Sequence, residues 1–181
     1  MDQRRIAVQL YSVRDDCEEN LDQSLAKIAG MGYEGVEFAG FYGHPAADVR
    51  RMVAEKGLQV VGAHIGMDDL ADPAFDRTVE FHKAVGNPTL IVSGLPIEQV
   101  TSIPALENAA DAFNRTAERL QPLGLRLGYH LHGPDVKPVE GRLPWEVILA
   151  GTRENVLMQA DIGSTWNLEV NALGGVQSIG Q

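Results

Sequence analysis

Two histidines end the fifth apolar run of this sequence, where their side chains could bind a metal ion or move protons. The run occupies residues 125–132 and places His130 and His132 two positions apart. Side chains at positions i and i+2 of a strand point to the same face, so both imidazoles should enter the same space. Histidine titrates near neutral pH and is a common metal ligand. This strand end is therefore the first candidate site.

Other polar side chains end other apolar runs in the same way. Glu37 and His64 end two earlier runs, and Asp161 ends a later one. In α/β architectures, catalytic groups collect at the C-terminal ends of parallel strands. The Asp161 carboxylate suits a hard divalent cation. Glu37 could hydrogen-bond sugar hydroxyl groups, and the small residues around His64 permit the close approach of a ligand. These residues could instead have purely structural roles. The histidines would then line the rim of the fold, and Asp161 would bind loop amides.

The neighbouring loops and helices add further candidates. Asp135 and Glu140, in the loop after the fifth run, are candidate carboxylate ligands. Trp166 and Tyr11 could wall a pocket, although aromatic residues at such positions are as typical of a core. His44 and His82 are expected at a helix start and on a helix surface, and neither is assigned to a site.

The elements that must position these residues alternate along the chain. Glycines follow the predicted helices, as expected for residues that end a helix in the left-handed conformation. Cys17 is expected near the start of the first helix, and Asp72 and Pro73 are expected as the cap and first turn of the third. The fourth helix should carry the apolar stripe Leu106, Ala110, Phe113, Ala117 and Leu120. Strands are predicted over residues 5–11, 34–38, 58–64, 89–93, 125–132 and 157–161.

Strands that alternate with helices predict an α/β protein with a parallel sheet and right-handed crossovers. The sequence contains no glycine-rich dinucleotide fingerprint and no phosphate-binding loop, so a (β/α)₈ TIM-type barrel is favoured over a doubly wound sheet. A full barrel needs about 250 residues, and this chain has 181. We therefore expect one barrel-like domain over residues 1–181, shortened to about six β/α units.

Composition limits the partners that this chain is expected to have. The formal net charge is −10, which opposes binding to a nucleic-acid backbone over a broad surface. The single cysteine, Cys17, excludes an internal disulfide framework. No apolar stretch is long enough for a signal peptide core or a membrane span, so we expect a cytoplasmic protein. The sequence also lacks the motif of a serine hydrolase and the spacings of structural zinc sites.

Five segments of the chain resemble the xylose-isomerase-like barrel superfamily, in particular its sugar phosphate isomerase/epimerase-like members. They are AVQLYSVR at residues 7–14, MGYEGVEFAG at 31–40, GAH at 62–64, GYHLH at 128–132 and QADIG at 159–163. The resemblance implies a (β/α)₈ barrel with a divalent metal, often manganese, magnesium, cobalt or zinc, at the C-terminal mouth.

The resemblance also implies roles for individual residues. Asp161 matches the metal-binding aspartate of the sixth strand, and the acid of the fifth region would be Asp135 or Glu140. The histidine of the seventh strand and the glutamate of the eighth have no counterpart here. In the matching proteins, the positions of Glu37, His64 and the paired histidines tend to lie around the substrate. From the residues and this resemblance together we expect Glu37, His64, His130 and Trp166 to bind substrate and His132 to be catalytic.

Three functions follow as hypotheses. The first is a metal-dependent sugar or sugar phosphate isomerase or epimerase that abstracts an α-proton and passes through an enediolate. The second is a catalytically incomplete barrel that binds a sugar or serves as an interaction module. The third is an apurinic-site endonuclease-like protein, with which His64 is compatible and the acidic charge is not. The expected partner is a small sugar, without a nucleic acid or a membrane, and a homo-oligomer is left open.

Overall fold

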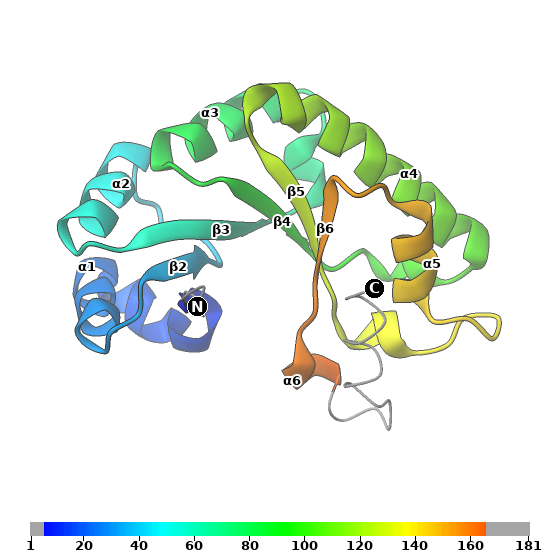
Figure 1. Ribbon diagram of the computed structural model, residues 1–181, viewed down its shortest axis with the longest axis horizontal. Helices are drawn as coiled ribbons and strands as arrows, with labels where there is room; N and C mark the ends of the chain where they lie inside the picture. The colour runs from blue at the N-terminus through cyan, green and yellow to red at the C-terminus, as the bar shows by residue number, and fades with distance from the viewer. Residues whose placement is uncertain (1–5, 166–181) are drawn as a thin grey trace, which may run out of the picture. The chain divides into compact units, whose positions relative to one another are not determined.

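The computed structural model describes residues 6–165, which form alternating strands and helices (Figure 1). Six strands follow in chain order: β1 (Ala7–Gln9), β2 (Gly35–Phe38), β3 (Gln59–Ile65), β4 (Thr89–Ser93), β5 (Arg126–His130) and β6 (Val156–Gln159). The α-helices are α1 (Arg14–Gly30), α2 (Ala46–Glu55), α3 (Phe75–Val85), α4 (Ile103–Leu120), α5 (Pro144–Gly151) and α6 (Ile162–Thr165). The predicted α/β class, with about six strand–helix units, is confirmed.

The chain divides inside β4 into two compact units, Met1–Leu90 and Ile91–Gln181. The first unit contains β1 to β3 with α1 to α3. The second contains β5 and β6 with α4 to α6. The prediction of a single domain over residues 1–181 stays a prediction.

In the first unit, parallel pairing fixes which side chains face the helices. Gln9 of β1 lies opposite Glu37 of β2. Val36 and Phe38, on either side of Glu37, are fully buried, and they form one core with apolar residues of α1 and α2, including Leu21, Leu25, Ile28, Val49, Met52 and Val53. Side chains alternate along a strand, so Glu37 points to the sheet face opposite the helices.

Helix α1 bends at Asn20, whose φ of −159° and ψ of 92° are not helical. The Asn20 side-chain oxygen accepts a hydrogen bond from the Gln23 N–H at 3.0 Å, which caps the second part of the helix. The turn before the bend contains Cys17, which is 1% exposed. Burial raises the pKa of the Cys17 thiol, so the thiol stays protonated near neutral pH.

Two sequence-based predictions about α3 are wrong. The helix begins at Phe75 after Ala74, and Asp72 and Pro73 precede it in a turn that follows the 3₁₀ helix η2 (Met67–Leu70). His82 is 5% exposed rather than on the surface. Position 82 shares a helix face with the buried residues Val79 and Val85, three residues away on either side. Helical spacing therefore places this imidazole in the core.

In the second unit, α4 packs against α5, and β5 lies beside β6 (Figure 1). The predicted apolar stripe of α4 is confirmed, since its five residues are all buried: Leu106, Ala110, Phe113, Ala117 and Leu120. Asn114 joins α4 to the segment after α5. Its amide donates to the Gly151 carbonyl at 2.9 Å and accepts from the Arg153 N–H at 2.8 Å.

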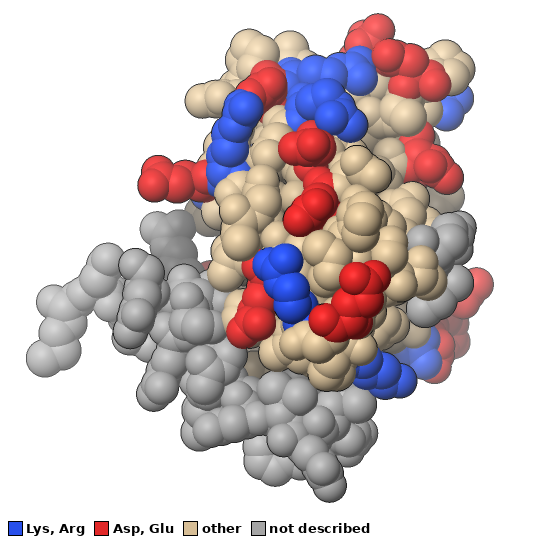
Figure 2. Space-filling model, turned by 90° about the vertical axis from the view of Figure 1, so that its right-hand side faces the viewer, with Lys and Arg blue, Asp and Glu red and all other residues tan. Residues whose placement is uncertain are grey.

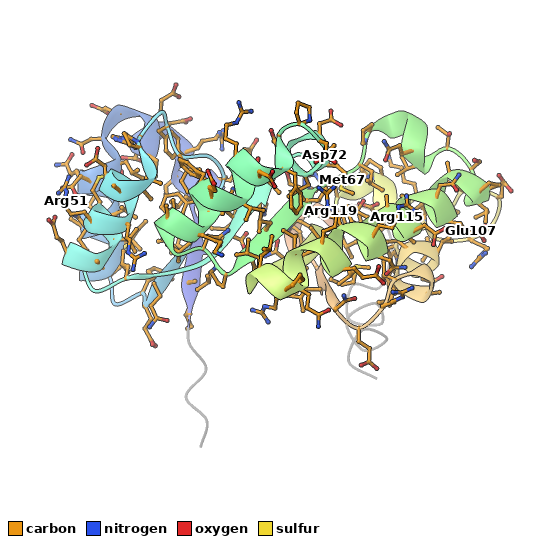
Figure 3. The ribbon with its side chains drawn as sticks, turned by 90° about the horizontal axis from the view of Figure 1, so that it is seen from above. Arg51, Met67, Asp72, Glu107, Arg115 and Arg119 are labelled. Carbon is orange, nitrogen blue, oxygen red and sulfur yellow. The ribbon has the colours of Figure 1, made fainter. Side chains whose placement is uncertain are left out.

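The outer helix faces carry charged side chains. Figure 3 labels Glu107, Arg115 and Arg119 along α4, and all three are exposed. On α2, Arg51 lies 3.2 Å from Glu55. The face shown in Figure 2 intersperses acidic and basic groups rather than presenting one continuous basic patch. None of the described helices is long and apolar enough to cross a membrane.

Candidate functional site

The first unit brings together three polar side chains from neighbouring strand ends: Gln9, Glu37 and His64. A register shift in β2 places Glu37 opposite Gly62 of β3, and His64, two residues further, points to the same face. Nε2 of His64 lies 3.0 Å from Oε1 of Glu37. Nδ1 of His64 lies 3.5 Å from Nε2 of Gln9. Glu37 and His64, both predicted to bind substrate, are thus neighbours.

This group is largely closed to solvent. The Glu37 side chain is 9% exposed and the His64 side chain 11%. A buried carboxylate is stabilised by a hydrogen-bond donor or a cation, and the His64 imidazole lies at the distance for either. A carboxylate and an imidazole in contact can exchange a proton, and such a pair can therefore serve in general acid–base catalysis.

The sequence-based prediction did not include Gln9. The first strand was predicted to run to residue 11, but β1 ends at Gln9 and the 3₁₀ helix η1 (Leu10–Val13) follows at once. Gln9 is therefore the polar residue at a strand end, which is the signal that identified Glu37 and Asp161. Its side-chain oxygen accepts a hydrogen bond from the Tyr11 N–H at 2.8 Å.

Tyr11 itself is 58% exposed and is not a core residue. The Arg14 guanidinium lies over its ring, 4.5 Å from the centroid, and donates to the Tyr11 carbonyl at 3.0 Å. These contacts hold the turn after β1, and with it the N–H that orients the Gln9 amide.

The second unit brings together His130, Gln159 and Asp161. His130 and Gln159 are register partners in β5 and β6, and Nδ1 of His130 lies 2.6 Å from Oε1 of Gln159. Nε2 of His130 lies 3.7 Å from Oδ2 of Asp161. The other Asp161 oxygen accepts from the Gly163 N–H at 2.8 Å. Asp161 therefore bonds a loop amide with one oxygen and faces an imidazole with the other.

His132 and Asp135 lie just beyond β5. The His132 ring is 4.8 Å from the His130 ring, so the two imidazoles are together as the i, i+2 spacing predicts. Asp135 is 1% exposed and accepts two hydrogen bonds, from the Tyr129 hydroxyl at 2.6 Å and from the His132 N–H at 2.7 Å. Both carboxylate oxygens therefore hold the turn that carries His132. The prediction of Asp135 as a metal ligand stays a prediction.

Burial acts on the two ionisable groups of this turn in the same direction. Loss of solvent raises the pKa of the Asp135 carboxyl, and the hydrogen bonds from Tyr129 and the His132 N–H partly oppose that rise. Burial and the nearby Asp135 charge raise the pKa of the Tyr129 hydroxyl. Tyr129 therefore keeps its proton and donates a hydrogen bond to the carboxylate.

Glu140 is placed away from these residues. It has a left-handed φ of 50° in the turn between Val139 and Arg142, and its Oε1 accepts from the Ile103 N–H at the start of α4, at 3.4 Å. The prediction of Glu140 as a metal ligand is not tested, but its observed contact is with a helix end. Trp166, predicted to bind substrate, lies outside the described residues.

Within residues 6–165, no group of three or more His, Cys, Asp or Glu side chains could hold a metal ion. One pair of potential donors is His130 Nε2 and Asp161 Oδ2, which lie 3.7 Å apart. An imidazole nitrogen and a carboxylate oxygen are donors that divalent transition metals accept. The donor set therefore fits two ligands of one cation, and additional ligands would be water, substrate oxygens or residues outside the described part.

Three solved structures are similar to this chain over most of its length. A sugar phosphate isomerase/epimerase from Parabacteroides distasonis matches with a TM-score of 0.85 and 19% identity, over 99% of this chain and 72% of that chain. A family 2 AP endonuclease from Brucella melitensis matches with a TM-score of 0.69 and 18% identity, over 97% and 75%. A D-psicose 3-epimerase, solved in the presence of D-fructose, matches with a TM-score of 0.61 and 17% identity, over 88% and 64%.

These similarities show the fold alone, and two further similar structures are described as xylose isomerase-like TIM barrels. At 17–19% identity, the first three structures do not transfer an activity. No protein-family model matches the sequence, and no curated protein matches it. The function must therefore be argued from the residues.

Proposed function

We propose that this chain, with the fold of the xylose isomerase-like barrels, is a metal-dependent sugar or sugar phosphate isomerase or epimerase. It would abstract the proton on a carbon next to a carbonyl group. The observation that carries the proposal is the contact of 3.0 Å between His64 and the buried carboxylate of Glu37, at the ends of neighbouring parallel strands. The names of two similar structures, an isomerase/epimerase and an epimerase, support this substrate class.

Glu37 is the proposed base. Its carboxylate takes the proton from the carbon, the C–H electron pair forms a carbon–carbon double bond, and the carbonyl oxygen becomes the oxygen of an enediolate. Return of the proton to the neighbouring carbon gives an isomer, and return to the opposite face of the same carbon gives an epimer. His64 lies against the carboxylate at 3.0 Å and can share its proton.

In the second unit, Asp161 and His130 are the proposed ligands of the divalent cation. A cation bound there would supply Lewis-acid polarisation of an oxygen atom that it binds. His132 is a proposed proton-transfer group of the second unit, because its exposed ring lies 4.8 Å from that of His130. Asp135 and Tyr129 hold the turn that presents His132.

The first alternative is an apurinic-site endonuclease, and the observation in its favour is the structural match to an AP endonuclease. The net charge of −10 and the mixed charges on the face in Figure 2 weigh against it, because backbone phosphates attract basic surfaces. The other alternative is a barrel that binds a sugar without turning it over.

The test is solvent exchange. The purified chain would be incubated in D₂O with Mn²⁺, Mg²⁺, Co²⁺ or Zn²⁺ and with ketoses, aldoses and their phosphates, while proton NMR follows the α-position. We expect loss of one α-proton signal in at least one sugar, and none with Glu37→Gln. Sugar binding without proton exchange would support the sugar-binding alternative. Cleavage of abasic duplex DNA would support the endonuclease alternative. Either result would contradict the isomerase proposal.

A further inference from the structure

The Gln9 amide has one orientation that its contacts allow. The Tyr11 backbone N–H can only donate a hydrogen bond, and it lies 2.8 Å from the amide atom assigned as Oε1. If the amide were turned over, its NH₂ group would face this N–H and two donors would meet. The oxygen therefore faces Tyr11, and the NH₂ group faces His64.

This orientation decides where His64 carries its proton. The Gln9 NH₂ group can only donate, and it lies 3.5 Å from Nδ1 of His64. In a neutral imidazole one nitrogen donates and the other accepts, so Nδ1 is the acceptor and Nε2 bears the hydrogen. That hydrogen lies on the nitrogen 3.0 Å from Glu37 Oε1.

At His130 the neighbouring amide presents the opposite group. Oε1 of Gln159 lies 2.6 Å from Nδ1, and an amide oxygen can only accept. Nδ1 therefore bears the hydrogen, and Nε2 presents a lone pair on the side of Asp161, whose Oδ2 is 3.7 Å away. The β5–β6 register fixes this pairing, because His130 and Gln159 lie opposite each other.

We propose that Gln9 and Gln159 are positioning residues that hold His64 and His130 in opposite tautomers. His64 carries its proton on Nε2, the nitrogen that lies 3.0 Å from the Glu37 carboxylate, and His130 offers a lone pair from Nε2. The chemical use of these two states rests on the proposed function, but the tautomers are properties of the folded chain and can be measured without substrate or metal.

The experiment is long-range ¹H–¹⁵N correlation NMR of the ¹⁵N-labelled full chain, recorded above neutral pH so that the imidazoles are uncharged. His64→Gln and His130→Gln spectra assign the two rings. We expect the protonated-type nitrogen signal on Nε2 of His64 and on Nδ1 of His130. The same tautomer in both rings, or the two assignments reversed, would overturn the proposal.

The same substitution at the two glutamines gives a matched pair. Glutamate has no NH₂ group, so Gln9→Glu removes the donor to Nδ1 of His64, and we expect Nδ1 to gain a proton. Gln159→Glu keeps an acceptor at Nδ1 of His130, so the His130 pattern should not change. Equal responses at both sites would contradict the assignment, and the backbone amide spectrum reports whether each variant is folded.

If either variant does not fold, the spectrum of the unmodified chain still decides the question. Failure of this proposal is distinct from failure of the proposed function. If the chain has the expected tautomers but shows no proton exchange, the tautomer inference holds and the isomerase proposal fails. If the chain exchanges the proton but has other tautomers, the isomerase proposal holds and the tautomer inference fails.

Discussion

The two units contain similar side-chain groups that differ in their contacts. Each has a histidine with a glutamine at Nδ1 and a carboxylate near Nε2. In the first unit the carboxylate is 9% exposed and 3.0 Å from the imidazole. In the second it is 34% exposed and 3.7 Å away. The amide also presents nitrogen in the first and oxygen in the second.

These differences give the same residue types different capacities. The Glu37–His64 contact is short and shielded from solvent, so it suits proton transfer between two groups that already touch. His130 and Asp161 are farther apart, and the Asp161 carboxylate is more open to solvent. This arrangement suits two ligands of one cation. Residue type alone therefore does not define the chemistry of a site, and the orientation of the neighbouring amide and the solvent exposure of the carboxylate complete the definition.

The largest expected effect is at Glu37. Glu37→Gln keeps the shape and removes the base, and we expect a loss of about 10²- to 10⁴-fold in the rate of α-proton exchange, the range for general base catalysis. Glu55→Gln on the surface of α2 is the matched control. An unchanged rate in Glu37→Gln would remove proton transfer from the first unit and break the comparison.

His82 extends the comparison to a histidine of the first unit that is surrounded by aromatic rings. Asn87 Nδ2 lies 2.9 Å from its Nδ1, and Phe41 and Phe81 pack around it. Burial lowers the pKa of His82 to about 4, and the charge of Asp69 acts in the opposite direction. In the unfolded chain the pKa is about 6.5. The unfolded state therefore binds more protons between these values, and stability falls as the pH decreases from about 6.5 to 4.

His82→Phe should remove this pH dependence. We expect the loss of unfolding free energy between pH 7 and pH 4 to shrink by about 2–3 kcal/mol in urea titrations. His44→Phe, at a half-buried imidazole, controls for the loss of a histidine as such. Parallel curves for the unmodified chain and His82→Phe would show that His82 is not buried neutral.

The next effect concerns the cation at the second unit. Asp161→Asn removes the charge and keeps the volume, and we expect divalent cation affinity to fall by at least about 10- to 100-fold, the range for weaker perturbations of metal sites. Asp111→Asn on the exposed face of α4 is the control, and calorimetric titration with Mn²⁺ is the measurement. If Asp111→Asn weakens binding equally, general surface charge rather than this site holds the cation.

The smallest effect is expected in the turn that carries His132. Tyr129→Phe removes the hydroxyl that donates to the buried Asp135 carboxylate, and we expect a destabilisation of about 1–2 kcal/mol. Phe113→Leu, at the ring packed against Tyr129, measures the cost of altered packing without loss of this hydrogen bond. Chemical denaturation gives both values, and a neutral Tyr129→Phe would mean that the bond does not stabilise the turn.

Much of the fold could be predicted because periodicity is a local property. The α4 stripe and the glycines that end the helices follow directly from spacing, and Gly86 and Gly124 have left-handed φ values of 87° and 76° as expected. The strands that carry Glu37 and His64 were also placed to within one residue, whereas β5 ends at His130, two residues before its predicted end. Each of these depends on a pattern within a few residues.

The rest depends on contacts between segments. Gln9 was missed because β1 ends two residues earlier than its apolar run. The Asp135 contacts require the buried Tyr129 hydroxyl and the His132 N–H, and no spacing rule gives them. His82 was assigned to a surface because its residue type is polar, although its helix position is apolar. Side-chain orientation in all three cases is set by tertiary packing, which one sequence does not reveal.

The central claim is that the first unit moves the proton and the second holds the cation. Calorimetric Mn²⁺ titration of the unmodified chain and of Glu37→Gln tests it most directly. We predict equal affinities for the two proteins, although Glu37→Gln has lost proton exchange. A Glu37→Gln affinity as low as that of Asp161→Asn, or no Mn²⁺ binding by the unmodified chain, would contradict the claim.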